Sequence, residues 1–439
     1  MFSAKTYTHR RQTLAQTLQK GLILLPGNGE AHMNYTGNTY PFRQDSNFRY
    51  FAGIAQPDLV LTIDAASGES KLYGDDFTLD DVVWMGEQRP VAELARDGGM
   101  DYGGPLDQLT DVLGDRQDIH YLPPYRESRR QQLRRWVGHF DQASVPLIRA
   151  VVEQRSVKSE EEIMEMDKAV FISMRMHAAA RDTAKSGMTE ASVAGLIEGI
   201  AVSAGGRLAY PAIVTRNGHI LHNHYHGNEM RRGDLLLIDA GAETKTGYAG
   251  DITRTLCIGG EMSERQQAVY KTVELAKTRC IRALRPGVAF REIHDLSCRV
   301  IAEGLKDLGL IKGDPQEAVA AGAHALFYPH GLGHMIGLDV HDMEDLGEDY
   351  VGYDNTVRRS EQFGTRNLRL GRRLQEGFTI TVEPGIYFIP KLIEHWRAEG
   401  KHRDFINYDG LEDYLNFGGI RLEDNVVITA DNCRVLGSV

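Results

Sequence analysis

The sequence predicts an α/β domain over residues 1–155, followed by an α+β domain over residues 156–439 with an internal pseudo-two-fold duplication. The first sign of the duplication is a repeated stretch. Residues 230–241 read Met-Arg-Arg-Gly-Asp-Leu-Leu-Leu-Ile-Asp-Ala-Gly, and residues 374–385 read Leu-Gln-Glu-Gly-Phe-Thr-Ile-Thr-Val-Glu-Pro-Gly, with the same spacing of glycine and acid. The second sign is that two helical segments precede each copy. We therefore expect two half-sheets that meet around a central site, with the helices outside.

The first domain alternates helical patterns with short strands. Residues 60–73 predict a β-hairpin that turns at Ala-Ala-Ser-Gly, because apolar β-formers flank a turn sequence. Its polar residues do not cluster, so this domain alone is not expected to be catalytic. The other predicted elements are strands at 21–26, 47–51 and 119–122 and a helix at 90–97.

Four helices are expected in the second domain, two in each half. The boundary lies near residues 155–159, where a polar stretch meets the capping box Ser159-Glu-Glu-Glu162. The first two helices run from this box to Gly187 and from Thr189 to Gly205. The second two run from the box at 263–266 to Pro286 and from about Phe290 to Gly309.

Composition excludes several classes of partner. The net charge is −11, whereas nucleic acids and anionic membranes both favour a basic surface. The four cysteines lie far apart without CxxC spacing, so neither a thiolate zinc site nor a disulfide framework is indicated. The N-terminus has no apolar signal segment, and no run approaches the roughly 18 residues of a membrane helix. We expect a cytoplasmic protein with reduced thiols.

Each repeated stretch ends an apolar strand with a carboxylate, Asp239 in the first and Glu383 in the second. A second strand in each half carries another acid, Asp251 or Glu423. Burial of an ionised carboxylate costs several kcal/mol unless the group is paired or binds a metal. Four buried acids therefore require positive charge nearby.

Three histidines, His330, His334 and His341, lie within twelve residues between the two acid-bearing halves. A single buried histidine is more often a hydrogen-bonded core residue than a ligand, but the four acids change this balance. Several carboxylates with one imidazole suit two hard or borderline divalent ions. The predicted ligands are Asp239, Asp251, His334, Glu383 and Glu423.

A buried salt-bridge network is the alternative explanation for the acids. It would use Arg254 and Arg421, but two arginines cannot neutralise four acids unless some acids are protonated. Strand alternation places Thr253 on the face of Asp251 and Arg421 on the face of Glu423. Thr253 and Arg421 are therefore expected to hold the ligands in place.

Five motifs carry a resemblance to a known family: DAG at Asp239, DITRT at Asp251, HGLGH at His334, VEPG at Glu383 and RLED at Glu423. They resemble the pita-bread metallopeptidases, which include aminopeptidase P, prolidase and methionine aminopeptidase. Residues 40–53 are similar to the N-terminal domain of the proline-specific members, so the likeness covers nearly the whole chain. The same domain resembles that of creatinase, but creatinase lacks the ligand acids, so a metal-free amidinohydrolase is not favoured.

The resemblance implies a peptidase with two divalent ions per chain, in which a hydroxide that bridges the metals attacks the scissile carbonyl. Mn²⁺ is the first choice on ligand hardness, and Co²⁺ or Zn²⁺ could also bind. Glu383 would be both ligand and proton shuttle, and His341 would stabilise the oxyanion. His222 matches a histidine near the leaving nitrogen, although His224 could take that place. The remaining matches are His330 in the substrate pocket and Tyr210 near the site.

The resemblance further implies cleavage before proline, and we expect an Xaa-Pro dipeptidase. Arg369, near the end of a prolidase-like insertion over residues 345–372, would bind the carboxylate of the proline, and Arg421 would also contact substrate. Aminopeptidase P, acting on longer peptides, is the alternative. A non-catalytic pita-bread binding module is a distant third, because no ligand acid is missing. A homodimer is expected, since proline-specific relatives pair through their N-terminal domains.

Overall fold

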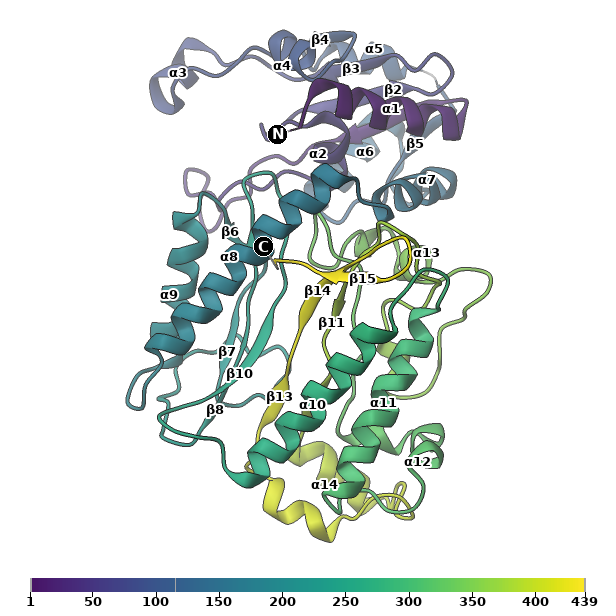
Figure 1. Cartoon of the computed structure of the whole chain (residues 1–439). Helices are drawn as coiled ribbons and strands as arrows, with labels where there is room; N and C mark the ends of the chain where they lie inside the picture. The colour runs from purple at the N-terminus through teal and green to yellow at the C-terminus, as the bar shows by residue number, and fades with distance from the viewer. Residues whose placement is uncertain (1, 115, 438–439) are drawn as a thin grey trace. The chain divides into compact units, whose positions relative to one another are not determined.

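The computed structural model describes residues 2–114 and 116–437 (Figure 1). The chain divides into a first unit that ends at Arg155 and a second unit that begins at Ser156. No helix within the described residues is long and apolar enough to cross a membrane.

The first unit is an α/β domain built on one five-stranded sheet, as expected. The strand order is β4-β3-β2-β1-β5, in which β1 pairs antiparallel with β2 and parallel with β5. The predicted hairpin is confirmed, because β2 and β3 are antiparallel neighbours. The strands are β1 (Leu22–Pro26), β2 (Val60–Asp64), β3 (Ser70–Tyr73), β4 (Tyr102–Gly104) and β5 (Ile119–Tyr121). The helices are α1 (Ala4–Leu18), α2 (Ser46–Ala52), α3 (Leu79–Met85), α4 (Val91–Asp97), α5 (Gln108–Leu113), α6 (Glu127–Val137) and α7 (Val145–Ser156).

One predicted strand in this unit is wrong. Residues 47–51 belong to helix α2, not to a strand. The side chain of Asp45 caps the helix by accepting a hydrogen bond from the backbone N–H of Phe48, 2.8 Å away. Phe48 and Phe51, three residues apart, are both buried on one helix face. The aromatic run therefore fits helical as well as strand periodicity, and the cap at Asp45 favours the helix.

The four predicted helices of the second unit are confirmed, although each ends a few residues earlier than expected. Both capping boxes are present, at Ser159 and at Ser263. Helices α8 and α9 form one pair, and α10 and α11 form another (Figure 1). The long helices are α8 (Glu160–Thr183), α9 (Glu190–Ser203), α10 (Glu264–Ala283) and α11 (Phe290–Asp307). Shorter helices are α12 (Pro315–Ala321), α13 (Glu348–Gly352) and α14 (Pro390–Ala398), with 3₁₀ turns η1 (Ala323–Leu326), η2 (Glu344–Leu346), η3 (Thr365–Asn367) and η4 (Asp409–Tyr414).

The duplication is visible in the strand pairing. In the first half β8 pairs antiparallel with β10, and in the second half β11 pairs antiparallel with β14. An isolated bridge between Thr253 and Glu423 joins the two halves. The three-stranded sheets are β10 (Thr253–Cys257), β8 (Leu235–Asp239) and β7 (Ile213–Thr215), and β11 (Thr379–Val382), β14 (Asp424–Ile428) and β15 (Cys433–Val435). The two-stranded sheets are β12 (Gly385–Tyr387) with β13 (Gly419–Arg421), and β6 (Arg207–Leu208) with β9 (Ala242–Glu243).

The second acid of each half does not lie within a strand, contrary to expectation. Asp251 lies two residues before β10, and Glu423 lies between β13 and β14. The side chain of Asn425 replaces the strand ladder at Asp251. It accepts a hydrogen bond from the N–H of Asp251 at 2.8 Å and donates one to the carbonyl of Asp251 at 2.6 Å. The ladder is thus interrupted where the acids must converge.

Candidate metal centre and substrate cavity

A cavity of about 700 Å³ opens within the second unit, between the two halves. All eleven predicted site residues line it, together with His224. They come from segments more than 200 residues apart in the sequence, from Tyr210 to Glu423. The structure therefore brings the whole predicted set together around one space.

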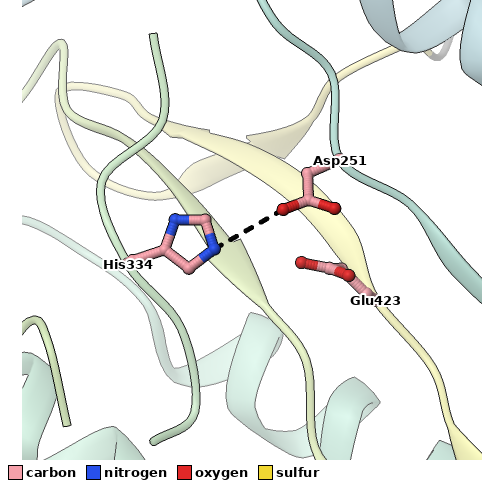
Figure 2. Close-up of side chains that lie close together, drawn as sticks. All are labelled: Asp251, His334 and Glu423. Atoms are coloured by element: carbon pink, nitrogen blue, oxygen red, sulfur yellow. Dashed lines mark ion pairs between the residues drawn. The ribbon is translucent and has the colours of Figure 1, made fainter. Parts of the chain in front are cut away.

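Asp251, His334 and Glu423 form the core of the candidate metal centre (Figure 2). One potential ligand atom from each lies within 4.8 Å of the others, and all three residues are buried. The imidazole of His334 faces Asp251, with Nε2 3.5 Å from the nearer carboxylate oxygen. Its Nε2 also lies 3.7 Å from Glu383 Oε1. Asp239 lies next to this group, linked to Asp251 through the hydroxyl of Tyr210.

The segment that carries His334 is aligned by β11. The backbone N–H of Thr381 donates to the carbonyl of His334 at 3.0 Å, and that of Glu383 donates to Leu332 at 2.8 Å. Gly333 permits this close approach, because a Cβ atom there would lie 2.1 Å from the carbonyl oxygen of Thr381. Gly333, the second glycine of the HGLGH motif, thus allows His334 to lie beside Glu383.

The arginines do not neutralise the whole acid cluster. Arg421 pairs with Asp239 at 2.5 Å, and Arg254 pairs with Asp424 at 2.6 Å. Asp251, Glu383 and Glu423 form no ion pair with an arginine in the described part of the chain. The alternative of a salt-bridge network therefore leaves these three carboxylates without a cationic side chain other than histidine.

The environment of Glu423 is the most direct evidence for a cation-binding site. Its Oε2 accepts a hydrogen bond from the hydroxyl of Thr253 at 2.6 Å, whereas Oε1 is buried without a hydrogen-bond partner among the described residues. Burial and the charge of Asp251 raise the pKa of Glu423 well above its usual value. Burial likewise raises the pKa of Glu383 to about 7. An unpartnered buried oxygen within a cluster of mutually repelling carboxylates fits a divalent metal site.

Neighbouring groups fix how the candidate ligands are presented. His334 Nδ1 lies 3.0 Å from the carbonyl oxygen of Met335. The other ring nitrogen, Nε2, therefore faces the acids. The Tyr210 hydroxyl donates to Asp239 at 2.6 Å and also contacts Asp251. Tyr210, which was expected near the site and among the residues that contact substrate, directs its hydroxyl to these two acids.

Arg421 also faces the acids more than the open cavity. Besides Asp239, its guanidinium donates to the hydroxyls of Tyr387 at 2.9 Å and Thr253 at 3.4 Å. This buried arginine therefore holds the metal-site carboxylates and their neighbours, as its expected supporting role requires. Its expected role in substrate contact is not evident from these bonds.

Four further histidines line the cavity: His222, His224, His330 and His341. His330 has one ring nitrogen 2.8 Å from the Tyr387 hydroxyl, and burial together with Arg421 lowers its pKa to about 3. The His341 ring lies edge-to-face with that of His334, with ring centres 4.4 Å apart. His222 and His224 both line the cavity, so their positions do not decide between them.

Arg369 lies at the rim of the cavity, where its side chain is about one-third exposed. Its Nε is 3.4 Å from Glu344 and 3.5 Å from Glu348. Its terminal nitrogens donate no hydrogen bond within the described residues. They could therefore receive a carboxylate from a ligand in the cavity.

Sequence reasoning missed three residues of this site: Tyr387, Asn425 and Glu344. Asn425 could have been found, because an asparagine within an apolar strand needs a buried hydrogen-bond partner. Tyr387 follows the motif at Glu383 but resembles an ordinary strand residue. Glu344 gave no local signal, because its partners are set by the loop conformation.

Comparisons with known proteins agree with the geometry. Residues 164–430 match metallopeptidase family M24, and residues 7–120 match the aminopeptidase P N-terminal domain. The chain is 34% identical to a probable Xaa-Pro aminopeptidase of Botryotinia fuckeliana, covering 96% of this chain and 90% of the relative. It is 30% identical to the Xaa-Pro dipeptidase of Homo sapiens, covering 98% and 90%. The solved structure of aminopeptidase P from E. coli with the inhibitor Pro-Leu matches with a TM-score of 0.81 and 29% identity, covering 100% of this chain and 95% of that one.

Proposed function

Since the chain belongs to metallopeptidase family M24, we propose that it hydrolyses the bond before proline and that Xaa-Pro dipeptides are its preferred substrates. The observation that carries the dipeptide preference is the position of Arg369, at the rim of the cavity that also holds the acid cluster. Arginine binds a carboxylate through two parallel hydrogen bonds, and in a dipeptide the proline itself bears that carboxylate.

Five residues would hold the metal: Asp239, Asp251, His334, Glu383 and Glu423. We propose two ions per chain, with Mn²⁺ preferred because the donors are mainly carboxylate oxygens, and with Co²⁺ or Zn²⁺ as alternatives. When bound, divalent ions would lower the pKa of a water molecule toward neutrality and polarise the scissile carbonyl.

The chain's own residues would perform the proton transfers and bind the substrate. Glu383 would take a proton from the attacking water and pass it to the proline nitrogen. His341, whose Nδ1 contacts Glu344, would present Nε2 to the substrate and stabilise the developing oxyanion. His330 and either His222 or His224 would line the space for the substrate. Proline is accommodated because its tertiary amide has no N–H that would need an acceptor.

Aminopeptidase P activity, which releases the first residue of longer peptides, is the second candidate, supported by the fungal and bacterial relatives. The deciding assay compares Ala-Pro with Ala-Pro-Ala, using purified protein with added Mn²⁺ and Ala-Ala as a substrate without proline. We expect a higher kcat/KM for Ala-Pro. A preference for Ala-Pro-Ala would assign aminopeptidase P, and hydrolysis of neither proline peptide would contradict the proposal.

Replacement of Arg369 by methionine is expected to raise KM for Ala-Pro by about 10- to 100-fold, because charge-assisted hydrogen bonds contribute about 1.5–3 kcal/mol. KM for Ala-Pro-Ala should change little, since the carboxylate of the tripeptide lies one residue further on. Steady-state kinetics with both peptides measure the difference.

The matched control is Arg366→Met, which removes the same charge from the same cavity rim. This variant should alter KM for both peptides weakly and equally. Equal losses on the two substrates in Arg369→Met would show that Arg369 does not recognise the dipeptide carboxylate.

We also propose a homodimer formed through the first unit. Helix α3 supports this, because Leu79, Val83, Trp84 and Met85 are all exposed, with 79% exposure for Trp84. Light scattering should report twice the chain mass of 49.0 kDa, and Trp84→Glu should shift the protein toward the single-chain mass. A wild-type protein that is only a 49.0 kDa species would contradict the dimer.

We also propose a cytoplasmic location. All four cysteines are free thiols in the structure. Free thiols are typical of a reducing compartment. Fractionation of cells that produce the protein would test this location.

A further inference from the structure

Glu344 lies directly behind two residues that line the cavity, His341 and Arg369. Its Oε2 contacts Nδ1 of His341, and its Oε1 lies 3.4 Å from Nε of Arg369. The bond to His341 lowers the pKa of Glu344 to about 2. A carboxylate at neutral pH therefore connects the two cavity residues without lining the cavity itself.

The backbone around Glu344 is held in a constrained turn. Met343, between Asp342 and Glu344, has a φ of 63°, in the left-handed region, although its side chain is buried. This conformation is unfavourable for a residue other than glycine. Asp342 is anchored by a buried ion pair with Lys158 at 2.9 Å. The turn returns Glu344 to His341, so that the N–H of Glu344 donates to the His341 carbonyl at 3.2 Å.

The bond to Glu344 decides which edge of the His341 ring meets the cavity. The proton on Nδ1 is donated to the carboxylate, so Nε2 is the nitrogen left for a ligand. No other hydrogen bond from this ring occurs within the described residues. Arg369, in contrast, has a second carboxylate nearby, that of Glu348 at 3.5 Å. Loss of Glu344 would therefore release His341 more completely than Arg369.

We propose that Glu344 is a positioning residue that orients His341 toward the scissile bond. This inference rests on the proposed peptidase function, in which His341 contacts the substrate. The competing explanation is that Glu344 only stabilises the insertion over residues 345–372 through its ion pair with Arg369. The two explanations differ in whether the effect of Glu344 on catalysis depends on His341.

A double-mutant cycle on kcat for Ala-Pro separates them. Glu344→Ala should lower kcat by about 10- to 100-fold, a range typical for residues that orient a functional side chain. In a His341→Ala background the same change should lower kcat by less than about threefold, because the oriented ring is already absent. Glu344→Gln should recover most of kcat, since its amide oxygen can still accept the Nδ1 proton.

Asp349→Asn is the control, because Asp349 lies on α13 and pairs with Arg359 at 2.9 Å without contacting His341 or Arg369. This variant should keep the wild-type kcat. All variants are assayed well below their melting temperatures. Equal losses from Glu344→Ala in both backgrounds, or a Glu344→Gln variant no better than Glu344→Ala, would overturn the inference. If wild-type protein cleaves neither Ala-Pro nor Ala-Pro-Ala, the proposed function fails instead.

Discussion

Asp251→Ala is expected to abolish peptidase activity and to lower the amount of metal bound by the purified protein. Asp251 is buried and belongs to the group that includes His334 and Glu423, so its loss would remove one of the proposed metal ligands. The two hydrogen bonds to Asn425 use only the backbone of residue 251, so they survive in the variant. The fold should therefore persist while metal binding is lost. Elemental analysis and the Ala-Pro assay measure the two effects.

Asp234→Ala is a suitable control for this experiment. Asp234 lies just before β8 much as Asp251 lies before β10, and it pairs with Arg216 at 2.8 Å away from the cavity lining. The control should keep its metal and its activity. An active Asp251→Ala enzyme, or full wild-type activity after exhaustive chelation, would contradict the proposed metal site.

Glu383→Gln is expected to reduce kcat by several orders of magnitude while the melting temperature stays near that of the wild type. The glutamine side chain has the same shape but cannot take up and release the proton that the proposed mechanism requires. The fold should tolerate the change, because burial already disfavours the charged form of Glu383 and raises its pKa to about 7. A melting curve recorded beside the kinetics separates catalysis from stability.

The exposed Glu376, seven residues earlier, provides the matched Glu→Gln control. Glu376→Gln should match the wild type in both measurements. The proton-shuttle role of Glu383 is wrong if Glu383→Gln keeps a near-normal kcat. It is also unsupported if the loss of activity follows entirely from unfolding.

Much of the local structure could be predicted from sequence, because it depends on near neighbours. The capping boxes at Ser159 and Ser263 mark the starts of α8 and α10 through hydrogen bonds that span three residues. The repeat of residues 230–241 at 374–385 predicted the duplication, because the same spacing of apolar residues and acids produces corresponding strands in the two halves. The exception was α2, where a short aromatic run fits both periodicities and the Asp45 cap favours the helix.

The sequence by itself determined which residues could form the site: four acids, a central histidine and an arginine suited to a carboxylate. Only the tertiary structure decided how their charges are paired. Arg421 pairs with Asp239, and the hydroxyl of Thr253 reaches Glu423 across 170 residues of sequence. It also decided that Glu344 lies against His341, through a left-handed turn at a buried methionine. Such contacts depend on how the two half-sheets and a loop pack together, and no local periodicity encodes the resulting distances.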